Sequence, residues 1–397
     1  MKYRSHRTSA ASAAFTSERS ELALRGQRRE PRPLPRQRRE LRPLPPDTCR
    51  QAGYVLVEIL VATVIAGALL GVLLHFAIEA QGAVTVQADV VDLQQRLRVA
   101  SDALRHDLLM AGAGPSSGVW RGPLSDVLAP VLPARTGGSG VDPELSYEAD
   151  RISITYVPDT RSQTVLLAGM SDAGAPLAID ANAPGCPAGG SCGFTRGDRA
   201  LVFSGDAHEA FTVSDAAAGI LSPREPLWHA YSAGSRVVAI VQRVYYLDRP
   251  GKRLMVYDGD RSDLPLVDHV VDLRFTYYVD PSAAGVPPPV PGAASCAYAA
   301  GDPPIPLLDD LAGPAPVPVA PSRLTDGPVC GQAPHRFDAD LLRVRRIGVT
   351  MRLETESAGL RGSGPAFRSP GTSPGGQKYV PDLRISFDVA PRNMAGR

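Results

Sequence analysis

The carboxylate of Glu58 is the group in this sequence whose surroundings most clearly indicate a functional role. It is the one formal charge in the apolar run from Tyr54 to Ile78, and the next charge along the chain is Glu79. A bare carboxylate in the hydrocarbon of a membrane costs roughly 3 kcal/mol or more. We therefore expect Glu58 to need a cationic partner, so that its chemistry is ion pairing rather than catalysis.

The residues around Glu58 resemble the processing site of type IV prepilins. Residues 53–58 read Gly-Tyr-Val-Leu-Val-Glu, with a basic segment before them and about 25 apolar residues after Gly53. In that family, which includes pilins and the pseudopilins of type II secretion, a prepilin peptidase cleaves after the glycine and methylates the new N-terminus. The resemblance implies that Gly53 ends a leader and that Tyr54, where most members carry Phe, becomes the N-methylated N-terminus. It also implies that Glu58 pairs with the N-terminal amine of a neighbouring subunit during assembly.

Residues 1–53 form the expected leader, and they are strongly basic. They hold 13 Lys or Arg against 5 Asp or Glu, so with a net charge of +1 for the whole chain the remainder carries −7. Basic flanks of membrane helices stay in the cytoplasm, which predicts a single-pass inner-membrane protein with a periplasmic C-terminal body. Low hydrophobicity predicts a disordered leader. It lacks the helix or aromatic pattern of a nucleic-acid reader, so no nucleic-acid partner is expected. A start codon nearer Leu41–Cys49 is an open alternative to a long leader.

A transmembrane helix over residues 54–80 must position these groups. The apolar run of about 25 residues is long enough to cross a bilayer core of roughly 30 Å. Gly67 and Gly71 form a small-xxx-small pair inside it, which is typical of close helix–helix approach but equally of ordinary glycine content in membrane helices.

An amphipathic continuation of the same helix is expected over residues 81–112. Apolar residues recur there at spacings of three and four, which places them on one helical face: Val86, Val90, Leu93, Leu97, Ala100, Leu104 and Leu108. His106 and Asp107 are assigned to the polar side, where they would hydrogen-bond to the body. Gly112, Gly114 and Pro115 predict that the helix ends near residues 111–114.

The remaining chain, residues 113–397, reads as a β-rich body, so the expected fold is α+β with the helix packed on an antiparallel sheet. Alternation and turn residues predict strands over residues 150–157, 199–204, 210–214, 236–248, 253–258, 273–280, 341–354 and 383–389. Residues 249–252 predict a hairpin turn between two of them. Residues 281–334 contain 14 prolines and are expected to form an irregular insertion.

Four of the five cysteines lie in the body, because Cys49 leaves with the leader. An even number of cysteines in an oxidising compartment predicts two disulfides. Three connectivities are possible, and local pairing of Cys186 with Cys192 and of Cys296 with Cys330 is the cheapest. A zinc site is the rival, but no histidine lies at ligand spacing.

Three aspartates close in sequence, Asp258, Asp260 and Asp263, are a weak candidate for calcium, because hard oxygen ligands at short spacing suit that ion. The alternative is an acidic turn at the end of a strand, and no metal is expected. The sequence also lacks the short motifs of hydrolases, nucleotide-binding loops and zinc proteases. We therefore expect no catalytic residues, no cofactor and no enzymatic activity.

The order of segments from the processing site onward is similar to that of PilW-type minor pilins, which share their architecture with GspJ-type minor pseudopilins. The similarity covers residues 53–112 and 236–353, including Leu-Arg-His-Asp-Leu at 104–108 and Val-Arg-Arg-Ile-Gly-Val at 344–349. It implies a pilin that starts pilus assembly or sits near the tip. The expected partners are the lipid bilayer, the prepilin peptidase, the inner-membrane assembly platform, and other pilins through their N-terminal helices. A GspJ-type pseudopilin and a membrane-anchored binding or adhesive module remain as alternatives.

Overall fold

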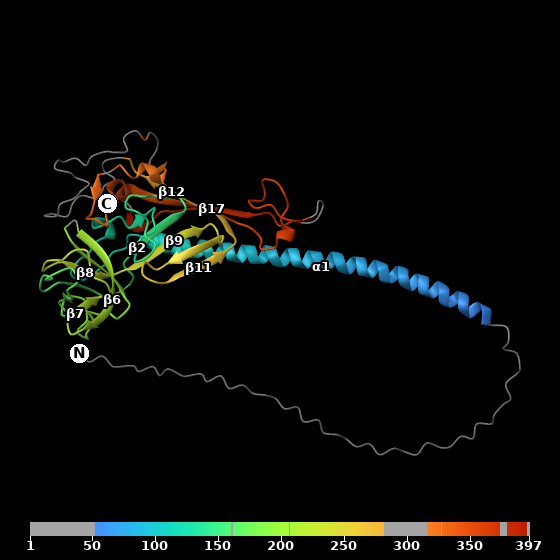
Figure 1. The fold of residues 1–397 in the computed structure, drawn as a ribbon, viewed down its shortest axis with the longest axis horizontal. Helices are drawn as coiled ribbons and strands as arrows, with labels where there is room; N and C mark the ends of the chain where they lie inside the picture. Colours follow the sequence, from blue (N-terminus) through green and yellow to red (C-terminus); the bar gives the residue numbers. More distant parts are fainter. Residues whose placement is uncertain are drawn as a thin grey trace, which may run out of the picture. The chain divides into compact units, whose positions relative to one another are not determined.

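A computed structural model describes residues 52–159, 162–205, 207–281, 311, 316–326, 328–373 and 379–394. Helix α1 (Ala52–Met110) comes first, and antiparallel strands follow it (Figure 1). The predicted α+β class is confirmed, because the C-terminal half of α1 packs on the sheets of the body.

Helix α1 has 59 residues and ends at Met110, as the sequence predicts. Gly112 follows with a φ of +75°, a left-handed conformation that glycine adopts without strain. Its N–H donates to the carbonyl of Thr155 at 3.1 Å, so the chain turns from the helix directly onto strand β2.

A five-stranded antiparallel sheet forms the first layer beside the helix. Its strand order is β1 (Val131–Leu132), β2 (Arg151–Tyr156), β9 (Val241–Asp248), β10 (Arg253–Tyr257) and β11 (Asp263–Asp268). The predicted hairpin turn at residues 249–252 connects β9 to β10. Edge strand β11 was not predicted, because its Pro265 argues against a strand; the register shift between Leu254 and Met255 accommodates it.

A four-stranded antiparallel sheet forms the second layer. Its order is β13 (Val317–Val319), β12 (Val270–Val279), β16 (Val344–Leu353) and β17 (Leu383–Val389). A two-stranded sheet, β14 (Val329–Cys330) with β15 (Phe337–Asp338), lies nearby in sequence. The described part of the proline-rich insertion therefore supplies β13 and β14, although its prolines predicted no regular structure.

A six-stranded antiparallel sheet completes the body. Its order is β3 (Gln163–Val165), β8 (Arg236–Ala239), β5 (Arg199–Ser204), β6 (Ala207–Ala217), β7 (Ile220–Pro223) and β4 (Leu177–Ala178). In Figure 1 the labels β6, β7 and β8 lie together in green, away from β12 and β17. Short 3₁₀ helices occur at Leu124–Asp126, Pro321–Arg323, Ala339–Arg343, Ala358–Leu360 and Arg392–Met394.

The single strand predicted over residues 236–248 is wrong. The structure divides it at Ile240 into β8 and β9, which belong to different sheets. Ile240 is buried and donates its N–H to the carbonyl of Arg199 at 2.9 Å. Residues 237–241 are a continuous apolar run through the division, so no sequence signal marks it.

Strand β2 is also more buried than its alternating sequence predicts. Ser153 is 2% exposed, although it lies between the two buried isoleucines Ile152 and Ile154. Its hydroxyl donates to the carbonyl of Ala134 at 2.6 Å and hydrogen-bonds to the hydroxyl of Thr136 at 2.8 Å. The segment after β1 therefore covers the polar face of the strand and satisfies it.

The strand predicted over residues 341–354 begins later than expected. A 3₁₀ helix occupies Ala339–Arg343, and β16 starts at Val344. The carboxylate of Asp338 caps that helix by accepting the N–H of Asp340 at 2.8 Å. A capping aspartate of this kind favours a helical turn over an extended chain.

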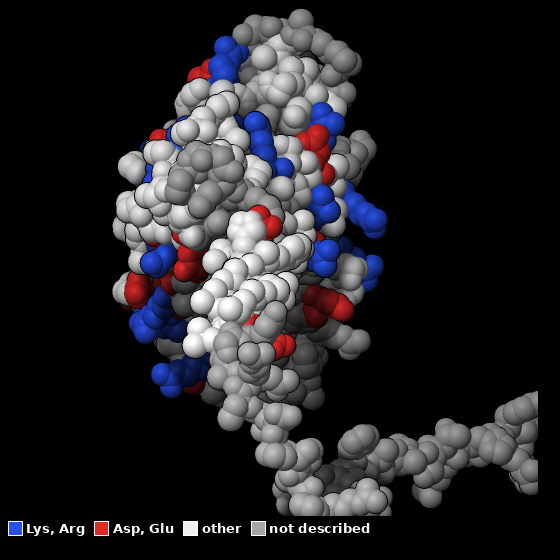
Figure 2. Space-filling view, turned by 90° about the vertical axis from the view of Figure 1, so that its right-hand side faces the viewer, with Lys and Arg blue, Asp and Glu red and all other residues white. Residues whose placement is uncertain are grey.

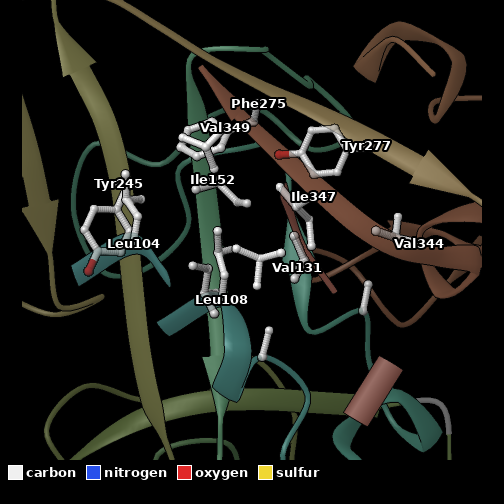
Figure 3. Close-up of a cluster of buried hydrophobic side chains, with 14 of the residues drawn as sticks. Leu104, Leu108, Val131, Ile152, Tyr245, Phe275, Tyr277, Val344, Ile347 and Val349 are labelled. Atoms are coloured by element: carbon white, nitrogen blue, oxygen red, sulfur yellow. The ribbon is translucent and has the colours of Figure 1, made fainter. Parts of the chain in front are cut away.

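Two hydrophobic clusters hold the body together. The larger one unites the buried face of α1 with the five-stranded and four-stranded sheets. Figure 3 shows Leu108 of α1 near Ile152 and Val131, and Leu104 near Tyr245, with Tyr277 and Ile347 of the four-stranded sheet in the same cluster. One face of the six-stranded sheet contributes Leu201 and Phe203 to this larger cluster. The opposite face carries the smaller cluster, around Phe194, Val202 and Phe211.

Candidate functional site

The first part of α1 has an apolar and exposed surface. Its large aliphatic and aromatic side chains from Val55 to Ile78 are exposed by between 50% (Val61) and 70% (Phe76). Figure 2 shows this helix as a largely white surface, with fewer blue and red side chains than elsewhere on the molecule. Among the described residues, α1 is the one helix that is long and apolar enough to cross a membrane. A surface of this kind on one helix is typical of membrane insertion or of packing with other helices.

Glu58 lies on this surface, in the second turn of the helix, and is exposed. No described residue forms an ion pair with it, whereas Glu79 lies 3.6 Å from the ring nitrogen Nε2 of His75. The predicted processing residues Gly53 and Tyr54 belong to the first turn of the same helix. The three residues assigned to processing and assembly therefore lie within two turns of each other.

Gly67 and Gly71 lie one helical turn apart on α1. A Cβ atom added at either position would meet no other atom within 4 Å. Within the described chain, nothing packs on this pair, so the room that the missing side chains leave is open to another helix.

The amphipathic half of α1 buries the face that its spacing predicts. Leu93, Ala100, Leu104 and Leu108 are at most 3% exposed and belong to the larger hydrophobic cluster. The other members of the predicted face, Val86, Val90 and Leu97, pack against the same cluster.

Asp107 lies on this buried face, and its assignment to the polar side was wrong. It is 6% exposed. Its two carboxylate oxygens accept from the hydroxyls of Tyr156 on β2 at 3.1 Å and of Tyr245 on β9 at 2.6 Å. The predicted hydrogen bonding to the body is thus confirmed, while the neighbouring His106 is exposed. Burial, together with the carboxylate of Asp107, raises the pKa of Tyr156 to about 12.

One predicted disulfide is confirmed. Cys186 and Cys192 are bonded, with their sulfur atoms 1.98 Å apart. Cys330 is also disulfide-bonded, but its predicted partner, Cys296, lies outside the described residues. The bond between Cys186 and Cys192 closes a short loop beside the six-stranded sheet, since both sulfurs lie within 3.6 Å of the carbonyl oxygen of Gln163 on β3.

The three aspartates of the weak calcium candidate do not share a site. The carboxylate of Asp258 accepts backbone N–H groups of residues 260–262 and so forms an acidic turn. Asp260 pairs with Arg224, and Asp263 pairs with Arg135 at 2.8 Å. No cluster of three or more potential metal ligands occurs among the residues that the structure describes.

A buried ion pair in the 3₁₀ helix Ala339–Arg343 gave no signal in the sequence. Asp340 Oδ1 lies 3.1 Å from Arg343 Nε, and both side chains are at most 2% exposed. Arg343 also donates to the carbonyl of Pro281, the first residue of the proline-rich insertion, at 2.9 Å. Burial raises the pKa of Asp340 to about 7. The pair therefore ties the base of the insertion to β16.

Comparisons with known proteins do not identify this chain. No protein-family model matches it, and neither a curated protein nor a solved structure does.

Proposed function

We propose that this protein is a minor pilin of a type IV pilus, a non-catalytic subunit that helps to start assembly or lies near the pilus tip. The observation that carries the proposal is the division of one continuous helix. Residues 55–78 of α1 expose an apolar surface, and residues 86–108 bury one face against the body. The exposed apolar stretch suits membrane or helix partners, and the amphipathic stretch suits packing on a globular body.

Glu58 supplies the specificity of assembly in this proposal. Once the leader is cleaved after Gly53, the amine of Tyr54 in a neighbouring subunit is a cation at the right depth to pair with it. The two opposite charges attract strongly in a medium of low polarity. Leaving either one buried without its partner is unfavourable. Docking therefore sets the axial register between subunits while it neutralises two charges.

The charge distribution and the disulfide support a periplasmic body. The basic residues lie before the apolar helix, which favours a cytoplasmic N-terminal side. The bond between Cys186 and Cys192 suits an oxidising compartment. Together they favour an inner-membrane protein that is extracted into a filament.

The proposal is tested by Glu58→Gln, which keeps the size of the side chain and removes its charge. Full-length protein is expressed in cells that lack the wild-type chain, and sheared filament fractions are compared. We expect Glu58→Gln to be inserted and cleaved normally, and its incorporation to fall about ten-fold or more, as loss of a buried ion pair predicts. Glu79→Gln is the matched control, because Glu79 lies outside the apolar run and faces His75, and it is expected to match the wild type.

Equal incorporation of Glu58→Gln, with normal pilus number, would contradict the proposal. The same strains separate the pilus from type II secretion, because a GspJ-type pseudopilin has the same processing site. Unchanged pili together with lost secretion would assign the chain to the secretion system instead.

A further inference from the structure

A cavity of about 410 Å³ lies within the body, between β6, the segment after β1 and the segment that leads into β15. Its walls are mostly apolar and include Leu132, Leu201, Ile240 and Phe337, with Trp228 at 66% exposure on the rim. A volume of this size is typical of sites for small organic molecules. The cavity is separate from the apolar helix, so whatever it holds is additional to assembly.

Arg199, the first residue of β5, is a cation on this wall that forms no ion pair with a described carboxylate, although Asp260 and Asp258 attract its guanidinium from a longer distance. Its Nη1 donates to the hydroxyl of Thr212 at 3.1 Å, and its Nη2 donates to the side-chain carbonyl of Gln242 at 2.8 Å. Both acceptors are neutral. Its Nε is buried and makes no hydrogen bond, and burial lowers the pKa of the guanidinium.

The other charged side chains around the cavity are already satisfied or reach solvent. Three ion pairs hold five of them: Arg224–Asp260, Arg336–Glu144 and Asp142–Arg151. The carboxyl group of Glu209 accepts the N–H of Trp228 at 2.8 Å, and burial raises its pKa to about 7. Glu225 is exposed. Among the described lining residues, Arg199 is therefore the half-buried cation that forms no ion pair.

We propose that the cavity binds a small organic carboxylate, with its carboxylate on the guanidinium of Arg199 and its apolar body against Leu201, Ile240 and Phe337. A guanidinium has five N–H donors, and Thr212 and Gln242 take two of them. The remaining donors suit the two oxygens of a carboxylate, a charge-assisted contact that a neutral group cannot replace. The apolar walls favour a carboxylate with a hydrocarbon or aromatic body over a fully hydrated inorganic anion.

The test uses the full chain in lipid nanodiscs and 4-fluorobenzoate as the probe, followed by fluorine NMR, with empty nanodiscs as the blank. The neutral isostere 4-fluorobenzamide tests the role of the charge. We expect the benzoate to bind at least about ten-fold more tightly than the amide, the size of effect that charged hydrogen bonds give.

Variants locate the site. Arg199→Met is expected to weaken benzoate binding about ten-fold or more, whereas Arg199→Lys, which keeps the charge, is expected to retain most of it. Arg274→Met is the control, because Arg274 is an exposed arginine of β12 outside the cavity. Circular dichroism checks that each variant is folded.

Three results would overturn the proposal: no benzoate binding by the wild type, equal binding of benzoate and amide, or unchanged binding by a folded Arg199→Met variant. If Arg199→Met does not fold, the comparison of benzoate with amide on the wild type decides alone. None of these results bears on filament incorporation, so this inference and the pilin proposal fail independently.

Discussion

Two carboxylates on helix α1 have opposite surroundings, and each setting defines a role for its residue. Glu58 is exposed on an apolar surface, and no described residue forms an ion pair with it. Asp107 is buried in the body and accepts from two tyrosine hydroxyls. The proposed assembly role assigns the first to a partner on a neighbouring subunit, and the second fixes the helix to the five-stranded sheet.

Asp107→Ala is expected to destabilise the body. It leaves the hydroxyls of Tyr156 and Tyr245 buried without their acceptor, which costs about 2–4 kcal/mol. Thermal unfolding of the full chain in detergent, followed by circular dichroism, should show a clearly lower Tm. Asp102→Ala is the control, since Asp102 is exposed on the same helix, and its Tm should match the wild type. Equal Tm values for the two variants would show that the tyrosine contacts add no stability.

Glu209 is expected to make the folded protein less stable as the pH rises. Burial raises its pKa from 4.5 to about 7, so the folded chain holds this proton more tightly than the unfolded chain. Its contribution is complete below pH 4.5 and is lost as the pH rises through 7, which amounts to about 2–3 kcal/mol. Burial lowers the pKa of His335 to about 4, so this residue makes the protein more stable as the pH rises from 4 to 6.5. The stability of the wild type must therefore be compared with that of a variant at each pH.

The variant Glu209→Gln stays neutral and can still accept the N–H of Trp228. Its Tm relative to the wild type is expected to rise as the pH increases from 5 to 8, while the effect of His335 cancels in the difference. A Tm difference that does not change over this pH range would mean that Glu209 does not retain its proton in the folded chain.

At the scale of elements, the amphipathic half of α1 is the element that the sequence predicts best. Its period of three to four residues is a local signal, and the face it defines is the face that the structure buries. Leu104→Ala should therefore create a cavity and cost about 2–5 kcal/mol of stability. Leu109→Ala is the matched control, because Leu109 is 47% exposed. Similar Tm losses for the two variants would contradict the packing of this face.

The sheets were predicted less well, because their pairing depends on contacts between distant residues. Strand β17 was predicted with its observed bounds, since it alternates and lies between irregular segments. The division at Ile240, the two-residue strands β1 and β4, and β13 in the proline-rich insertion depend on partners elsewhere in the chain. The burial of Glu209 could not be recognised for the same reason, whereas Asp107 lies three residues after Leu104, so the helical period already places it on the buried face.

At the scale of the whole molecule, one chain combines two surfaces that need different environments. Residues 55–78 of α1 expose apolar side chains, residues 54–397 together carry a net charge of −7, and the body packs around two hydrophobic clusters. The proposed minor pilin uses both surfaces, because its helix would meet lipid first and other helices afterwards.

The central claim, processing as a prepilin, is tested most directly at the N-terminus of the mature chain. Full-length protein is expressed in cells with an active prepilin peptidase, and the membrane fraction is analysed by mass spectrometry of N-terminal peptides. Glycine at position 53 matters because it lets the peptidase approach the scissile bond closely. The mature chain is expected to begin with N-methylated Tyr54, and Gly53→Ala should slow its appearance. An intact leader on the wild-type protein in these cells would rule out processing as a prepilin.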